Sequence, residues 1–172
     1  MRGFVLNLQA MAEYLPLYKD AALLTVGIGW AGIAGSIVIG LAVALVIHFR
    51  IPVARQLCRA YVELFRNTPL LIQLFFFYFG LPRFGFSITP QLCGALGLAL
   101  HGGAYMAESF RSGFESVDTI QRESSLALGL TRLQAVKYVI LPQAVALAFP
   151  SFVANVIFLL KETSVFSAIS LM

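Results

Sequence analysis

The chain has 172 residues, of which 59% are hydrophobic and only 12% are charged. The charged share is about half of that in an ordinary soluble domain, and the mean hydropathy is +0.86. A soluble domain of this size cannot bury so much apolar surface, so the composition predicts an integral membrane protein. The formal net charge of +4 then informs orientation in the membrane and does not indicate nucleic-acid binding.

Residues 1–20 mix charged and apolar side chains without the order of a secretory signal peptide, which runs from basic to apolar to small residues. We predict that they form an N-terminal interfacial segment, a short amphipathic helix lying on the membrane surface. The membrane domain is then expected to occupy residues 21–172.

Four apolar segments predict membrane crossings, since a crossing helix needs about 20 mostly apolar residues. The clear ones are residues 21–47, 88–107 and 145–160. Between the first two, an amphipathic stretch at 53–65 leads into a short, phenylalanine-rich stretch at 69–81. We interpret this pair as one broken helix, with Pro69 starting the inner piece, where a missing N–H costs little. The predicted fold class is an all-α polytopic bundle of about four transmembrane helices.

Basic residues are concentrated in two segments, one after the first predicted crossing and one after the third. Eight of the 12 Lys and Arg residues lie there, namely Arg50, Arg55, Arg59, Arg66, Arg111, Arg122, Arg132 and Lys137. Positive charge is retained on the cytoplasmic side of membranes. We therefore predict an N-terminus outside the cell and one long cytoplasmic segment, residues 111–142.

Small residues recur every four positions in two of the crossings. These residues are Gly32, Ser36, Gly40 and Ala44 in the first, and Ala95, Ala99, Gly103 and Ala107 in the third. Such stripes let helix backbones approach closely in lipid. They favour a packed bundle over a simple membrane anchor.

Residues 111–142 contain the start and stop signals of two short helices. Asp118 is expected to cap the first, with Gln121 completing a capping box, and Gly129 to end it in a left-handed conformation. Thr131, followed three residues later by a glutamine, is expected to cap the second, and Pro142 to end it. A helix pair held at a fixed angle by a glycine predicts a rigid cytoplasmic coupling segment.

The residues of this segment resemble a known signature. Glu123-Ser124-Ser125, then Gly129, then Ile140-Leu141-Pro142 is similar to the loop of ABC importer permeases written Glu-Ala-Ala, glycine and Ile-x-Leu-Pro, with two serines in place of the alanines. The flanks resemble the histidine, glutamine, glutamate and arginine permease branch. The matching pieces are residues 61–71, 104–108, 140–144 and 160–164. That family continues into one further span, so the resemblance also suggests a truncated chain.

The resemblance implies a permease subunit of an ATP-driven importer that moves a polar amino acid across the cell inner membrane. The implied partners are a second permease subunit, two ATP-binding subunits and an extracytoplasmic solute-binding protein. This chain is then not an enzyme and binds no cofactor, because ATP and Mg belong to the partner ATPase. The implied ATPase-coupling residues are Glu123, Ser124, Ser125, Ala127, Leu128, Gly129 and Pro142.

Polar residues within membrane segments are costly and mark candidate substrate contacts. The candidates are Arg66, Thr68, His101, Glu108, Lys161, Glu162, Thr163 and Ser164. Structural alternatives remain open: Lys161 can reach the outer interface, Glu108 can pair with Arg111, and His101 can bond a neighbouring helix. The segment from Arg66 to Pro69 can likewise be a plain interfacial anchor. Gln73 and Asn155 are buried amides of the same structural kind.

Other functions explain less of the chain. A passive channel or structural subunit accounts for the small-residue stripes but not for the rigid segment, and a non-functional fragment is a further alternative. A DNA-binding helix-turn-helix is disfavoured because both ends of the pair join membrane spans. Gly27-x-Gly29-x-x-Gly32 matches a dinucleotide fingerprint by letter but follows no strand. Cys58 and Cys93 lack metal-site spacing and are interpreted as small apolar residues.

Overall fold

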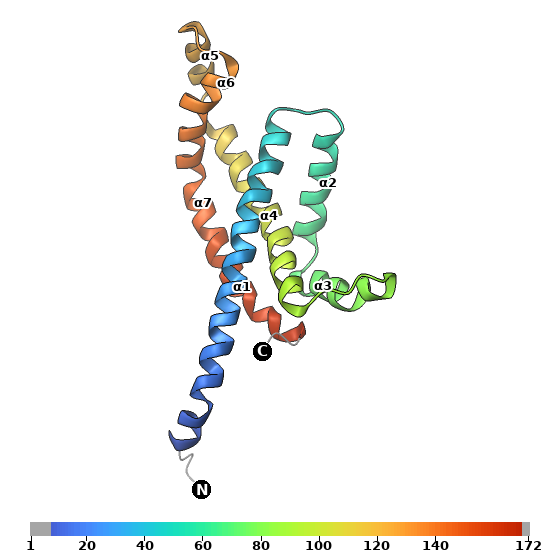
Figure 1. The fold of residues 1–172 in the computed structure, drawn as a ribbon. Coiled ribbons are helices and arrows are strands. Elements are labelled where there is room, and N and C mark those ends of the chain that lie inside the picture. The colour runs from blue at the N-terminus through green and yellow to red at the C-terminus, as the bar shows by residue number, and fades with distance from the viewer. Residues whose placement is uncertain (1–7, 170–172) are drawn as a thin grey trace.

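The computed structural model describes residues 8–169, which are helical with short connections and no strand. Figure 1 shows α1, α4 and α7 side by side, α2 on the other flank of α4, α3 turned away from the bundle, and α5 and α6 together at one end. The elements are α1 (Leu8–His48), α2 (Ala54–Asn67), α3 (Leu70–Phe75), η1 (Phe76–Gly80), η2 (Leu81–Phe84), α4 (Pro90–Ser116), α5 (Thr119–Ala127), α6 (Arg132–Ala135), η3 (Val136–Ile140), α7 (Leu141–Glu162) and η4 (Thr163–Ile169). The predicted all-α bundle is confirmed.

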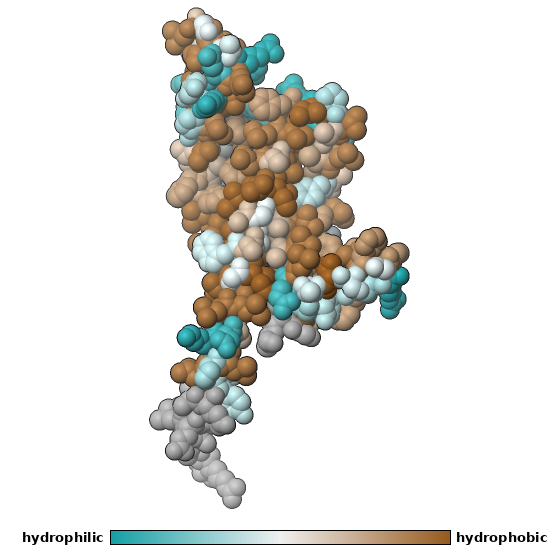
Figure 2. Space-filling view, in the orientation of Figure 1, coloured by the Kyte–Doolittle hydropathy of each residue, from teal (hydrophilic) through white to brown (hydrophobic). Residues whose placement is uncertain are grey.

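The lengths and compositions of the helices identify the candidate crossings. Tyr14–His48 and Arg132–Ile169 are long and apolar enough, and Ala54–Asn67 with Leu70–Phe84, bent by 105°, makes a third if the pair is one crossing. The third predicted crossing falls in α4, which has 27 residues and is therefore about 40 Å long. By composition α4 is not among these candidate crossings; it lies between α1 and α7 and is rich in small buried residues. Figure 2 shows a hydrophobic body between more polar ends.

The N-terminal part of the chain differs from the prediction. From Leu8 onward the chain is one uninterrupted helix, α1, of 41 residues. The boundary predicted at residue 20 is therefore not the end of a separate helix, because α1 runs through Asp20 without a break. Residues 1–7 of the predicted interfacial segment lie outside the described residues.

Small residues bring α1 and α4 into close contact, as the two stripes predict. A Cβ atom added to Gly32 would lie 2.8 Å from the Cβ of Leu98, and one added to Gly103 would lie 2.7 Å from Cγ2 of Ile39. Real Cβ atoms do not approach neighbours that closely, so only glycine permits this spacing. We call this contact the α1–α4 seam.

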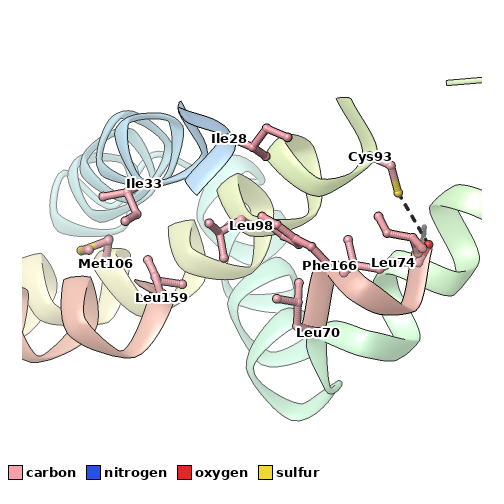
Figure 3. Packing of buried hydrophobic residues seen from close by; sticks show 10 residues of the cluster. Ile28, Ile33, Leu70, Leu74, Cys93, Leu98, Met106, Leu159 and Phe166 are labelled. Atoms are coloured by element: carbon pink, nitrogen blue, oxygen red, sulfur yellow. Dashed lines mark hydrogen bonds between the residues drawn. The ribbon is translucent and has the colours of Figure 1, made fainter. Parts of the chain in front are cut away.

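A compact apolar cluster fills the space where α1, α3, α4 and α7 meet. Figure 3 shows Ile33, Leu98 and Leu159 turned toward one another from three helices, with Phe166 of η4 beside Leu70 of α3. Cys93 is buried in the same cluster, with its Sγ 3.7 Å from the carbonyl oxygen of Leu74. Both cysteines are free thiols, in keeping with their interpretation as packing residues.

The predicted caps of the helix pair are largely confirmed. The Asp118 carboxylate accepts from the Ile120 amide at 3.0 Å, although Gln121 does not complete a capping box at this site. Gly129 has φ of +85°, and the amides of Gly129 and Leu130 bond back onto α5 in the Schellman pattern. Thr131 and Gln134 form the complete capping box.

The prediction that Pro142 ends the second helix is wrong. α6 continues through the π-helix η3 into α7, so that Arg132–Ile169 is one long helical segment. Within η3 the amide of Leu141 bonds to the carbonyl of Val136, five residues earlier. This wider turn shifts the hydrogen-bonding register just before Pro142, so the missing N–H of the proline does not break the helix.

Candidate functional site

The broken crossing places polar backbone and side chains beside α4. α2 ends at Asn67, Pro69 precedes α3, and the chain bends by 105° between the two pieces. Thr68 in the break is extended, and its hydroxyl donates to the carbonyl of Leu64 at 2.8 Å. Arg66, one turn before α3, lies over the Tyr105 ring of α4, 5.4 Å from its centroid. The break therefore faces the middle of α4.

A cleft of about 380 Å³ lies between the break, α4 and the end of α7. Four of the predicted substrate-pathway residues line it, although they come from three separate parts of the chain. They are Arg66, Thr68, His101 and Glu162. Two aromatic residues that the sequence did not single out, Tyr105 and Phe158, form part of its wall, with ring centroids 5.2 Å apart.

The cleft is lined by charged groups of both signs, by further polar groups and by aromatic rings. The guanidinium of Arg66 and the carboxylate of Glu162 are complementary to a carboxylate and an ammonium group, respectively. Thr68 and His101 offer further hydrogen-bonding atoms, and the two aromatic rings offer apolar contact. Within residues 8–169 no group of acidic, histidine and cysteine side chains is arranged to hold a metal ion.

The remaining predicted pathway residues lie elsewhere. Lys161 and Ser164 are exposed and do not line the cleft, and Thr163 donates its hydroxyl to the carbonyl of Leu160 at 2.7 Å. Glu108 lies near the other end of α4, where it forms the predicted pair with Arg111. A role in substrate binding for these four residues stays a prediction.

The Glu108–Arg111 pair faces a second, larger cavity of about 1110 Å³, at the end of the bundle that holds α5 and α6. Arg111 also bonds Glu115 at 2.5 Å. The guanidinium of Arg111 donates to both carboxylate oxygens of Glu108 beside this cavity. Seven arginines and four carboxylates line this cavity, which gives it an excess of three positive charges.

The predicted coupling residues form an exposed surface at the same end. Glu123, Ser124 and Leu128 are exposed, and the side chain of Leu128 is 82% accessible. Ser125 is the buried exception, and its hydroxyl donates to the carbonyl of Arg122 at 2.7 Å. A short helix pair with a largely exposed outer surface is suited to contact another protein.

The family of the chain follows from the comparison of its sequence with known families. Residues 36–170 match the family described as the inner membrane component of binding-protein-dependent transport systems. This chain belongs to that family. It is therefore a multi-pass protein of the inner membrane, and the match includes both the broken crossing and the coupling segment.

Relatives within the family share most of their length with this chain. PatM of Vibrio harveyi, a probable amino-acid ABC transporter permease protein, is 39% identical over 165 residues, which cover 94% of this chain and 73% of PatM. The glutamine transport system permease protein GlnP of Escherichia coli (strain K12) is 34% identical over 157 residues, which cover 90% of this chain and 72% of GlnP.

Solved structures have the same fold. The crystal structure of an amino acid ABC transporter with histidines includes a chain that is 33% identical, with a TM-score of 0.87, covering 97% of this chain and 78% of that one. The MetNI methionine ABC transporter, at 22% identity and a TM-score of 0.76, supports the fold alone. The helix arrangement described above is thus shared with a chain of an amino acid ABC transporter.

The sequence predicted only some of the residues that line the cleft. Sequence reasoning missed Tyr105 and Phe158 as cleft residues because each also fits an ordinary apolar helix position. A signal was available for Tyr105, which lies in the family-like motif at residues 104–108. Phe158 carries no such signal, since it is one phenylalanine in an apolar helix.

Proposed function

We propose that this chain is the permease subunit of an ATP-driven importer that moves a polar amino acid across the inner membrane, with the cleft as its substrate site. The observation that carries the proposal is the presence of Arg66 and Glu162 on one cleft with His101 between aromatic rings. An amino acid has a carboxylate and an ammonium group on one carbon, and these two side chains can pair with both. The amino-acid transporters among the relatives support the same substrate class.

The helix pair α5–α6 is the proposed contact with a partner ATPase. Its exposed residues Glu123, Leu128 and Gly129 lie in the signature-like loop, and the continuous segment from α6 to α7 joins that loop to the cleft. A second permease subunit and an extracytoplasmic solute-binding protein complete the proposed assembly. In this arrangement the end of the permease that holds α5 and α6 faces the cytoplasm, and the N-terminus lies outside the cell.

Uptake in proteoliposomes tests the proposal. The full chain is reconstituted with its ATPase and solute-binding partners, and uptake of labelled polar amino acids is measured with and without ATP. We expect ATP-dependent uptake, and a roughly ten- to hundredfold loss in kcat/KM for Glu162→Gln, because a hydrogen bond to a charged group contributes about 1.5–3 kcal/mol. Arg66→Gln is expected to lower uptake similarly.

Lys161→Gln is the comparison variant, because Lys161 is adjacent to Glu162 but exposed and outside the cleft, and it also tests the substrate-binding role predicted for Lys161 from the sequence. Its uptake is expected to stay within about twofold of the unmodified chain, as for an ordinary surface substitution. Equal losses in the Lys161 and Glu162 variants would contradict the cleft assignment. Uptake that needs no ATP would support the passive-channel alternative instead.

The orientation has its own test. A cysteine introduced at Lys137, on the exposed surface of η3, is expected to react with a membrane-impermeant maleimide only after the cells are opened. Cys58 and Cys93 are first replaced by alanine so that the label reports one position. Reaction in intact cells would place the coupling segment outside and overturn the proposed transport mechanism.

A further inference from the structure

Gln73 is a buried amide that does not line the cleft but contacts three groups around it. Its side chain is only 7% exposed. The Nε2 amide nitrogen lies 3.1 Å from the carbonyl oxygen of Phe65, 2.9 Å from that of Thr68, and 3.1 Å from Nδ1 of His101. One side chain therefore joins the end of α2, the break and the middle of α4.

The two carbonyls that Gln73 reaches are among those that the break deprives of helical partners. In a continuous helix the carbonyl of Phe65 would accept from the amide of residue 69, which is Pro69 and has no N–H. The carbonyl of Thr68 would accept from the amide of Ile72, but that amide instead bonds to Pro69 at 3.1 Å. Carbonyls at membrane depth that do not reach the cleft need an internal donor. Gln73 supplies that donor.

His101 links this arrangement to the cleft. Its ring is 3% exposed, lines the cleft, and packs 5.1 Å from the ring of Tyr105. Arg66 and Thr68 belong to the segment whose backbone the Gln73 amide holds, and both line the opposite side of the same cleft. The distance between these two sides thus depends on a side chain that is outside the cleft.

We infer that Gln73 is a positioning residue of the substrate site, which holds the Arg66–Thr68 segment of the broken crossing at a fixed distance from His101. The amide has two hydrogens for three acceptors, and its own Oε1 is buried without a donor among the described residues. A buried oxygen without a donor lowers the free energy of unfolding. A need for fixed geometry of the break during substrate binding explains why Gln73 is present despite this cost. This inference rests on the proposed function of the cleft.

The first test measures the break itself and needs no substrate. Spin labels are placed at Leu64→Cys on α2 and Phe76→Cys on η1, two exposed positions on either side of the break, after replacement of both native cysteines. Gln73→Leu keeps the volume of the side chain and removes its donor. The distance between the two labels is measured in the assembled transporter. We expect a narrow distribution in the parent protein and a broad one in Gln73→Leu.

Asn155→Leu is the matched control. Asn155 is also an amide within the bundle, and it donates to the carbonyl of Tyr105 at 3.2 Å and to Ser109 at 2.7 Å, but it does not touch the break. This variant is expected to leave the distance distribution narrow. Equal broadening in both variants would mean that any lost amide loosens the bundle, and would overturn the inference, as would a narrow distribution in Gln73→Leu.

The second test measures the cleft. Gln73→Leu and the shorter Gln73→Asn are expected to raise the KM for amino-acid uptake about tenfold, the effect of one lost buried hydrogen bond, with basal ATPase activity unchanged. An unchanged KM would overturn the role in the substrate site. Failure of the parent protein to transport any amino acid would instead contradict the proposed function, and the distance measurement would still decide whether Gln73 holds the break.

Discussion

The α1–α4 seam and the α5–α6 helix pair are held together in opposite ways. In the seam, glycines such as Gly32, Gly40 and Gly103 remove side-chain volume so that distant parts of the chain touch. In the pair, Thr131 and Gly129 satisfy the ends of short helices through bonds to near neighbours, and a Cβ added to Gly129 would meet nothing within 4 Å. The seam depends on tertiary packing, and the pair on local hydrogen bonds.

This difference reflects the surroundings of the two regions. Apolar side chains gain nothing by leaving lipid for another apolar helix, so close packing is the main source of attraction within the bundle. The helix pair is exposed and short, and isolated helices of that length are unstable without caps. A substitution in the seam is therefore expected to affect the whole bundle, and one in the pair only its own segment.

Gly40→Leu is expected to have the largest effect. A Cβ at Gly40 would contact Met106 and would lie 2.9 Å from the amide of Ala107, so α1 must move away from α4. We expect a loss of about 3 kcal/mol or more, the upper range for overpacking, seen as a lower fraction of monodisperse protein in size-exclusion chromatography. Gly27→Leu is the control, since a Cβ there meets nothing within 4 Å. Equal losses would show that added bulk on α1, and not the seam, is responsible.

Gly129→Val is expected to have an intermediate and local effect. The position has φ of +85°, which costs a residue with a Cβ about 1–2 kcal/mol, and valine is additionally branched. We expect normal membrane insertion and no stimulation of the partner ATPase by substrate. Gly129→Asn, whose side chain tolerates this conformation, should keep most of the stimulation. Unchanged uptake and stimulation in the valine variant would contradict a rigid coupling segment.

Ser151→Ala is expected to have the smallest effect and tests whether polar contacts matter in the bundle. The hydroxyls of Ser151 and Ser109 lie 2.6 Å apart across α4 and α7. Interhelical hydrogen bonds in membranes contribute about 0.6 kcal/mol on average, and Asn155 still donates to Ser109. A small shift in the unfolding midpoint during SDS titration is therefore expected. Ser167→Ala, which removes only a bond within η4, should give no shift.

The difference between local hydrogen bonds and tertiary packing also explains which features could be predicted from the sequence. Local features depend on residues within four positions of one another, and they could be predicted. They include the caps at Asp118 and Thr131 and the left-handed conformation of Gly129. The small-residue stripes predicted the seam because their period identifies a helix face. Pro142 was misjudged because the π-helix that accommodates it leaves no simple mark in the sequence.

The cleft was predicted only in part for a physical reason. Arg66, His101 and Glu162 were candidates because polar groups are unusual in membrane segments, but their meeting at one cleft depends on packing between distant helices. The donor role of Gln73 toward Phe65 and Thr68 likewise depends on how α3 folds back after Pro69. Residue type predicted the members of the site, and tertiary structure determined which of them share it.

The uninterrupted helical segment from Arg132 to Ile169 has a mechanical consequence. Its first turn belongs to the exposed pair, and Phe158 and Glu162, about 40 Å further along at 1.5 Å per residue, contribute to the cleft wall. No loop interrupts the backbone between these two places. Rotation of the segment about its own axis at the exposed helix pair would thus change which side chains point toward the cleft, without any rearrangement in between.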